Sequence, residues 1–309
     1  MNRKHIIVAF MLSALCAGGV NAQGSLKPFD VTDAWLKKME TTAPSKPSVP
    51  VQTKKKVLLF SLFTGFNHWV VPHTAEVVKI ISKKSGAFEV TESKDIKDFS
   101  KESLSQYDVL VLDNNCSKGD HRDLFRDVLE QDKSLTEEEI LTQAAEMENN
   151  LLAYVASGGG LVVLHGGIVM QNSSARFGEM VGGSFDYHPK QQQIDVKLVD
   201  AKHPLVAAFN GQGFSHIDEP YVFKNAYFDY NFHPLLYMET ASIEGFRKGA
   251  MEGVKYVSWI KPYGKGRVFY SSPSHNAQSY DNPALLQFIL DGMQYASGDL
   301  KCDDSPMKR

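Results

Sequence analysis

Three histidines follow short apolar runs that have the composition of β-strands. They are His68 after residues 57–62, His165 after residues 161–164 and His275 after residues 267–270. Imidazole can act as a general acid, a general base or a metal ligand near neutral pH. Because open parallel sheets bind ligands at the carboxyl ends of their strands, we expect these rings to meet in one cleft.

The sequence around His165 has the pattern of a sharp strand-to-helix turn. His165 ends an apolar run and is followed by Gly166 and Gly167. Glycines permit a tight turn and let a ligand approach the backbone. Since imidazole is an unusual covalent nucleophile, we interpret His165 as a base, an acid or a metal ligand. The alternative is a histidine that only hydrogen-bonds neighbouring loops.

Two loops add further polar side chains. Asn67 and His68 follow Gly65 in a loop where both can donate hydrogen bonds to oxyanions or hydroxyls, and the alternative is an ordinary glycine turn. His188 precedes Pro189, which favours an extended backbone and presents the imidazole on a loop.

The chain has neither an HExxH motif nor a ladder of cysteines and histidines, so no local zinc signature is present. A divalent metal such as zinc would need ligands from distant parts of the chain. The candidates are His68, His165, His188 and His275. Cys116 is interpreted as a small buried residue or a free thiol, and the oxidation state of Cys116 and Cys302 is left open.

The elements that must position these residues alternate between strand and helix in the first half of the chain. The strands are predicted at residues 57–62, 88–91, 107–112 and 161–164, and the helices at 73–83 and 136–157. Thr136 and Glu139 form a predicted capping box at the start of the second helix. This order predicts a mostly parallel sheet with helices on both faces.

The second half has a different pattern. Shorter strands are predicted at residues 194–199, 221–223, 235–238, 256–261 and 267–270, with a closing helix over 283–295. A hairpin turn is expected at Gly264-Lys265-Gly266. We therefore predict an α/β fold with an added antiparallel β portion.

Charge and the first residues bear on partners and location. The formal net charge is −3 and no block of Lys or Arg dominates, which argues against nucleic-acid binding. Arg3 and Lys4 precede an apolar stretch and Ala22 offers a cleavage position, which predicts an export signal and a periplasmic or otherwise exported protein. The alternative is a membrane anchor; after cleavage we expect no membrane span.

Composition also suggests how the chain divides. The predicted parts are a signal peptide over residues 1–22, a proline-containing linker over 23–56 with one short helix near 34–39, a domain over 57–298 and a polar tail over 299–309. The sequence leaves open whether the protein forms a homo-oligomer.

Several segments in this order resemble the ThuA-like (trehalose utilisation) family of the class I glutamine amidotransferase-like superfamily. They are TGFNH (64–68), YVASGGGLVVLHGG (154–167), GGSFDYHP (182–189), HPL (203–205), DEPY (218–221) and GKGRVFYSSPSH (264–275). The resemblance covers nearly all of residues 57–298 and implies a flavodoxin-like sheet. The amidotransferase cysteine is replaced by His165, and His275 falls at the position of the triad histidine. The resemblance therefore implies that glutaminase chemistry is absent.

The resemblance also implies a role in sugar catabolism, beside enzymes that oxidise glycosides at C3. A 3-keto sugar has an acidic α-hydrogen that a His or Glu base can remove, for isomerisation or elimination. The resemblance also favours a functional role for Glu219. The alternative is that Glu219 and Asp218 are simply two solvated acidic residues in a loop.

We therefore expect a protein that acts on a sugar or keto-glycoside by acid–base chemistry. The expected catalytic residues are His165, Glu219 and His275, and the expected substrate-binding residues are Asn67, His68, Gly166, His188 and Tyr221. The alternatives are a carbohydrate-binding protein without turnover and a metal-dependent hydrolase.

Overall fold

The computed structural model describes residues 26–247 and 253–307. Its centre is a nine-stranded sheet with the order β2-β1-β3-β4-β11-β10-β9-β6-β7. The parallel half consists of β2 (Phe88–Ser93), β1 (Lys55–Phe60), β3 (Val109–Asp113), β4 (Gly160–Leu164) and β11 (Gly266–Ser271). Because parallel strands end at the same edge of a sheet, the segments after β1, β4 and β11 all lie at one edge.

The other half of the sheet is antiparallel. It consists of β10 (Val254–Tyr263), β9 (His233–Glu239), β6 (Gln192–Leu198) and β7 (Phe214–Asp218). β5 (Ser184–Tyr187) and β8 (Val222–Lys224) form a separate two-stranded sheet. The predicted α/β fold with a mostly parallel sheet and an antiparallel addition is confirmed. β5 and β7 were not predicted, because both are short and neither alternates cleanly between buried and exposed residues.

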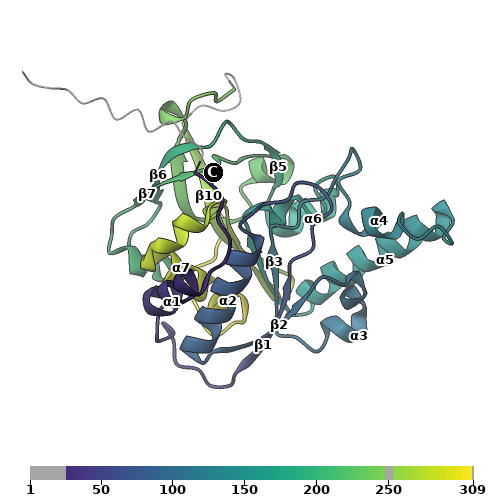
Figure 1. Ribbon diagram of the computed structural model, residues 1–309, viewed down its shortest axis with the longest axis horizontal. Coiled ribbons are helices and arrows are strands. Elements are labelled where there is room, and N and C mark those ends of the chain that lie inside the picture. Colours follow the sequence, from purple (N-terminus) through teal and green to yellow (C-terminus); the bar gives the residue numbers. More distant parts are fainter. Residues whose placement is uncertain (1–25, 248–252, 308–309) are drawn as a thin grey trace, which may run out of the picture.

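Helices cover both faces of the parallel half (Figure 1). One face carries α1 (Asp33–Thr42), α2 (Val71–Ser85) and α7 (Pro283–Ala296); the other carries α3 (Lys101–Leu104), α4 (Leu124–Leu129), α5 (Glu137–Ala156) and α6 (Ala175–Val181). Short 3-10 helices lie at Ile96–Phe99, His165–Val169, Pro204–Phe209, Asn225–Asp229, Thr240–Ser242 and Ala277–Asp281. The predicted capping box is present, with Glu139 accepting from the backbone N–H of Thr136 at 2.8 Å.

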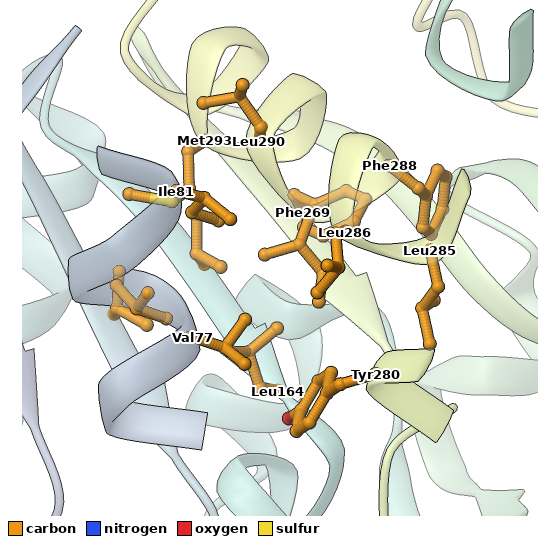
Figure 2. Close-up of a cluster of buried hydrophobic side chains, with 14 of the residues drawn as sticks. Val77, Ile81, Leu164, Phe269, Tyr280, Leu285, Leu286, Phe288, Leu290 and Met293 are labelled. Carbon is orange, nitrogen blue, oxygen red and sulfur yellow. The ribbon is translucent and has the colours of Figure 1, made fainter. Parts of the chain in front are cut away.

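The strands bury both of their faces because successive side chains point in opposite directions. Val57, Leu59, Val109 and Val111 join the core under α2 and α7, and Leu58, Phe60, Leu110 and Leu112 join the core under α5 and α6. In the first core, Val77 and Ile81 of α2 face the α7 side chains, with Leu164 and Phe269 of the sheet beneath them (Figure 2). Continuous apolar strands therefore hold the loop-bearing edge rigid.

The segment before β1 packs against the domain. Residues 26–54, which we call the strap, lie within the expected linker over 23–56 and contain α1 where the short helix near 34–39 was expected. Trp35 and Met39 of α1 are buried, and the Gln294 side chain accepts from the Ser48 N–H at 3.0 Å and donates to the Val49 carbonyl at 3.0 Å. The strap resembles a tether in sequence because its apolar residues are few and its prolines many.

The expected polar tail over 299–309 is also packed where the structure describes it. The Asp303 carbonyl lies 3.0 Å from Nε2 of His203, and the Met307 N–H donates to the Phe232 carbonyl at 3.0 Å. The predicted signal peptide over residues 1–22 lies outside the described residues. Within residues 26–247 and 253–307, no helix combines the length and apolar character needed to cross a bilayer.

Packing of the strap makes a stability prediction. Replacing Met39, which is 0% exposed, with Ala should lower the free energy of unfolding by about 2–5 kcal/mol, because a buried side chain is lost and a cavity remains. Urea denaturation measures this change. The control Lys37→Ala, on the exposed face of the same helix, should change it by less than about 0.5 kcal/mol. Equal stability of M39A and the native protein would show that the strap is not part of the folded domain.

Candidate functional site

His165 stands at the turn that follows β4. Its backbone has φ of 43°, in the left-handed region that side chains other than glycine seldom adopt. A Cβ atom at Gly166 would lie 2.9 Å from Sγ of Cys116 and 3.0 Å from Cε1 of His68, so only glycine leaves the turn undisturbed. The His68 ring thus lies close to the backbone of Gly166.

The loop after β1 carries His68 and is fastened to the loop after β3. The N–H groups of Thr64 and Gly65 both donate to the Cys116 carbonyl, at 3.0 and 2.8 Å. A Cβ atom at Gly65 would lie 2.4 Å from the Ser117 carbonyl oxygen, so this close approach also requires glycine. His68 is buried at the end of this loop, 2% exposed.

Four side chains from four separate segments converge at the carboxyl edge of the sheet. We call them the histidine–glutamate cluster: His68, His165, Glu219 and His275, whose ligand atoms all lie within 4.8 Å of one another. Oε2 of Glu219 lies 3.1 Å from Nδ1 of His275 and 3.5 Å from Nε2 of His165. The two imidazole nitrogens are 3.3 Å apart.

Hydrogen bonds to groups outside the cluster determine which histidine ring nitrogens direct a lone pair into the cluster. Nδ1 of His165 is 2.7 Å from the Ser272 carbonyl, so it carries the proton and Nε2 presents a lone pair to the cluster. The Cys116 thiol donates to the Gly166 carbonyl at 3.6 Å, and Nδ1 of His68 lies 3.7 Å from the same sulfur. Burial raises the pKa of the Cys116 thiol to about 12, so this sulfur stays protonated.

The charges of the cluster follow from burial and close contact. Burial and the neighbouring rings of His165 and His275 lower the pKa of His68 well below its ordinary value. Burial opposes ionisation of Glu219, but close contacts with the His165 and His275 imidazoles outweigh it and lower the pKa of this carboxyl. Burial likewise opposes protonation of His275, but the hydrogen bond to Glu219 outweighs it and raises the pKa of this imidazole. The cluster is therefore a buried carboxylate among basic nitrogens.

Asp218, next to Glu219, has a different task that the sequence did not reveal. It is 1% exposed, and its carboxylate accepts from the backbone N–H groups of Ser274 at 2.8 Å and His275 at 3.1 Å. Ser274 has φ of 121°, a conformation that favours glycine. The carboxylate therefore holds a strained loop in place and with it the His275 ring.

The remaining predicted residues lie around the cluster. Tyr221 is 2% exposed and its ring packs on His165 with centroids 4.1 Å apart. Nε2 of His188 lies 3.7 Å from Oε1 of Glu219, and its side chain is 37% exposed, at the opening of the site. Asn67 is exposed and belongs to a neighbouring groove with Trp69. The structure thus brings His188 to the cluster and leaves Asn67 apart from it.

Phe66 is a further residue at this site that sequence reasoning missed. It is 60% exposed, although its ring packs edge-on against His68 at 4.7 Å and lies nearly parallel to His275 at 6.5 Å. An exposed aromatic face above imidazoles is suited to contact an apolar ligand surface. Its position within the TGFNH segment, next to Asn67 and His68, could have indicated a place at the site.

A disulfide between Cys116 and Cys302 is not present in the described part of the chain, where both are free cysteines. Cys116 is buried, as interpreted from the sequence.

The fold and the edge site define an α/β protein with a histidine-rich cleft at the end of a parallel sheet. Residues 56–296 match the family model described as "ThuA: Trehalose utilisation". The chain therefore belongs to the ThuA family, and this description supports a carbohydrate-related role.

Solved structures agree on the fold. A ThuA-like protein from Bacteroides uniformis superimposes with a TM-score of 0.57 at 15% identity, covering 82% of this chain and 93% of that one. A ThuA-like protein from Parabacteroides merdae gives 0.54 at 20% identity, covering 82% and 98%.

A curated match is local. A stretch of 75 residues is 35% identical to the isoleucine–tRNA ligase of Rippkaea orientalis, which is 23% of this chain. The matched stretch spans only 8% of the ligase and carries no functional argument.

The role of Asp218 is tested by Asp218→Asn. An amide has one acceptor oxygen, so one buried N–H of the loop loses its partner, and the free energy of unfolding should fall by about 1–3 kcal/mol in urea denaturation. The matched control Asp186→Asn, at an exposed aspartate, should change it by less than about 0.5 kcal/mol. If both variants are equally stable, the carboxylate does not hold the loop.

Proposed function

We propose that this ThuA protein is an exported, metal-dependent enzyme that moves a proton on a carbonyl-bearing sugar such as a 3-keto-glycoside. The observation that carries the proposal is the convergence of His68, His165, Glu219 and His275 within 4.8 Å. Export rests on the composition of residues 1–22, and the sugar rests on the family description.

The donor set fits a divalent transition metal such as zinc. Three imidazole nitrogens and one carboxylate oxygen are ligands that zinc prefers, and ligands bound at about 2.0–2.1 Å in a tetrahedron are roughly 3.3 Å apart. The three separations among Glu219, His165 and His275 are 3.1, 3.3 and 3.5 Å. A metal held by these residues and His68 would supply Lewis acidity toward a sugar oxygen.

Hydrogen bonding alone satisfies this arrangement poorly. Nε2 of His165 presents a lone pair, Glu219 is ionised, and both face Nδ1 of His275. One proton on that nitrogen can serve only one of the two acceptors, which leaves the other without a donor. A cation at the centre would satisfy all of them, and the contact of the Ser272 carbonyl with the second nitrogen of His165 is of the kind that orients metal ligands.

His188 is the residue best placed to move the proton. Its Nδ1 lies 2.9 Å from the Pro189 carbonyl, so Nδ1 carries the hydrogen and Nε2 is free to accept one. After accepting a proton, the ring is cationic and faces the Glu219 carboxylate at 3.7 Å. The ring is partly exposed at the opening, where a substrate carbon can approach. We assign His188 as the base, in place of the substrate-binding role expected from the sequence.

Metal content tests the cluster. The purified chain should contain one equivalent of metal by elemental analysis, and His165→Ala and Glu219→Gln should each reduce that content to background, because a buried ligand is lost. The control His121→Ala, at an exposed histidine outside the cluster, should keep the full content. Metal binding that survives in both cluster variants would contradict the site.

Turnover tests the role of His188. His188→Ala should lower kcat on a 3-keto-glucoside about 10²–10⁴-fold while the metal content stays unchanged, since the base is removed and the ligands are kept. Product formation followed by chromatography gives the rate. A native protein that binds the sugar without converting it would establish the binding-protein alternative, and release of an aglycone by water without loss of the α-hydrogen to solvent would establish the hydrolase.

A further inference from the structure

A groove beside the histidine–glutamate cluster has no part in the chemistry described above. It has a volume of about 480 Å³ and lies between residues 28–31 of the strap and a second wall that contains Asn67, Trp69 and His73. We call it the strap groove. Its existence depends on the packed strap, which a free tether would not provide.

The strap groove and the cluster share one short stretch of chain. His68 and Phe66 face the cluster, where His68 lies with its ring centroid 5.1 Å from that of His165. Asn67 and Trp69, the alternate residues, line the groove. Phe66 and Asn67 are consecutive and both exposed, so a ligand longer than one ring that lies on Phe66 can also contact the groove.

The lining of the groove combines aromatic rings with a few polar side chains. The rings of Phe29 and Trp69 stand 5.3 Å apart between centroids at 58°, and both are only partly buried. Asn67 and Asp30 add an exposed amide and an exposed carboxylate. Aromatic faces with a few polar groups match a pyranose, which has an apolar face and a hydroxyl-bearing edge.

The charge of the groove favours neutral ligands over anionic ones. Its lining contains the carboxylate of Asp30 and neither lysine nor arginine. His73 forms the floor, and burial lowers the pKa of its imidazole, so it adds no positive charge near neutral pH. A phosphorylated or carboxylated sugar would meet repulsion from Asp30 here, whereas a neutral sugar would not.

The groove is held in its shape before any ligand arrives. His73 packs against Phe29 at 4.8 Å, Trp35 at 4.8 Å and Trp69 at 5.1 Å, so the aromatic walls rest on one buried ring. The start of the strap is tied to the cluster side through Gln191. Its side chain accepts from the Leu26 N–H at 2.8 Å and donates to the Asn276 side chain, next to His275, at 3.2 Å.

From these contacts we infer that the strap groove binds the second ring of a neutral glycoside whose first ring occupies the cluster. The inference rests on the proposed function and adds its substrate class: a sugar of at least two rings, or a glycoside with a ring-sized neutral substituent. Phe29 and Trp69 stack on that ring, and Asn67 bonds its hydroxyls. Phe66 contacts the first ring.

Binding of unmodified sugars tests the groove without any need for turnover. By calorimetry, the native full chain should bind maltose about tenfold more tightly than methyl glucoside, and Phe29→Ala should remove that difference because a stacking face is lost. Asn67 has an exposed side chain that contributes little to the packing. Asn67→Ala should reduce the preference for maltose over methyl glucoside severalfold. The control Lys37→Ala, on the exposed face of α1, should leave both affinities unchanged.

Turnover separates failure of the groove from failure of the proposed function. With the 3-keto derivatives of maltose and of methyl glucoside, Phe29→Ala should lower kcat/KM about tenfold for the first and less than twofold for the second. Equal affinity of the native chain for maltose and methyl glucoside, or an unchanged preference in both variants, overturns the subsite. Absence of turnover with a retained preference for maltose overturns the proposed function and leaves the subsite supported.

Discussion

The site depends on the burial of one carboxylate, Glu219, among three imidazole rings. A buried charge without compensation costs several kcal/mol, so the fold must bring it donors or a cation. The protein does so from three strand ends of one parallel sheet, after β1, β4 and β11, and from the end of β7. The rigid parallel half of the sheet therefore fixes a charge balance that no local segment could create alone.

Support for the cluster comes from groups that do not belong to it. The Ser272 carbonyl fixes the proton of His165, the Asp218 carboxylate fixes the loop of His275, and the missing side chain at Gly166 admits the His68 ring. Each of these contacts places the lone pair of a ring nitrogen or holds a ring in position. This division explains why adjacent acids differ in role, with Asp218 directed to the backbone and Glu219 to the imidazoles.

Much of the fold could be predicted because its determinants are local. The apolar runs, the capping box at Thr136 and the glycines after His165 each have a pattern that few other structures use. The three histidines were found because strand ends meet at one edge. The direction of Asn67 could not be predicted, since it depends on which face of the loop turns toward the sheet. The roles of Asp218 and Glu219 depend on the end of β7, a strand too mixed in composition to predict.

The burial of the strap could not be predicted from its sequence. Its apolar residues, such as Trp35 and Met39, are scattered among prolines and polar residues, so its composition is typical of a tether. Only the surface of α2 and α7 makes its burial favourable, and that surface is known once the sheet is assembled.

X-ray absorption at the zinc edge of the purified, zinc-loaded chain tests the central claim most directly. The account predicts a first shell of four or more nitrogen and oxygen neighbours at about 2.0–2.1 Å, with the outer-shell signal of three imidazole rings. A spectrum with sulfur neighbours, or one without imidazole scattering, would contradict it.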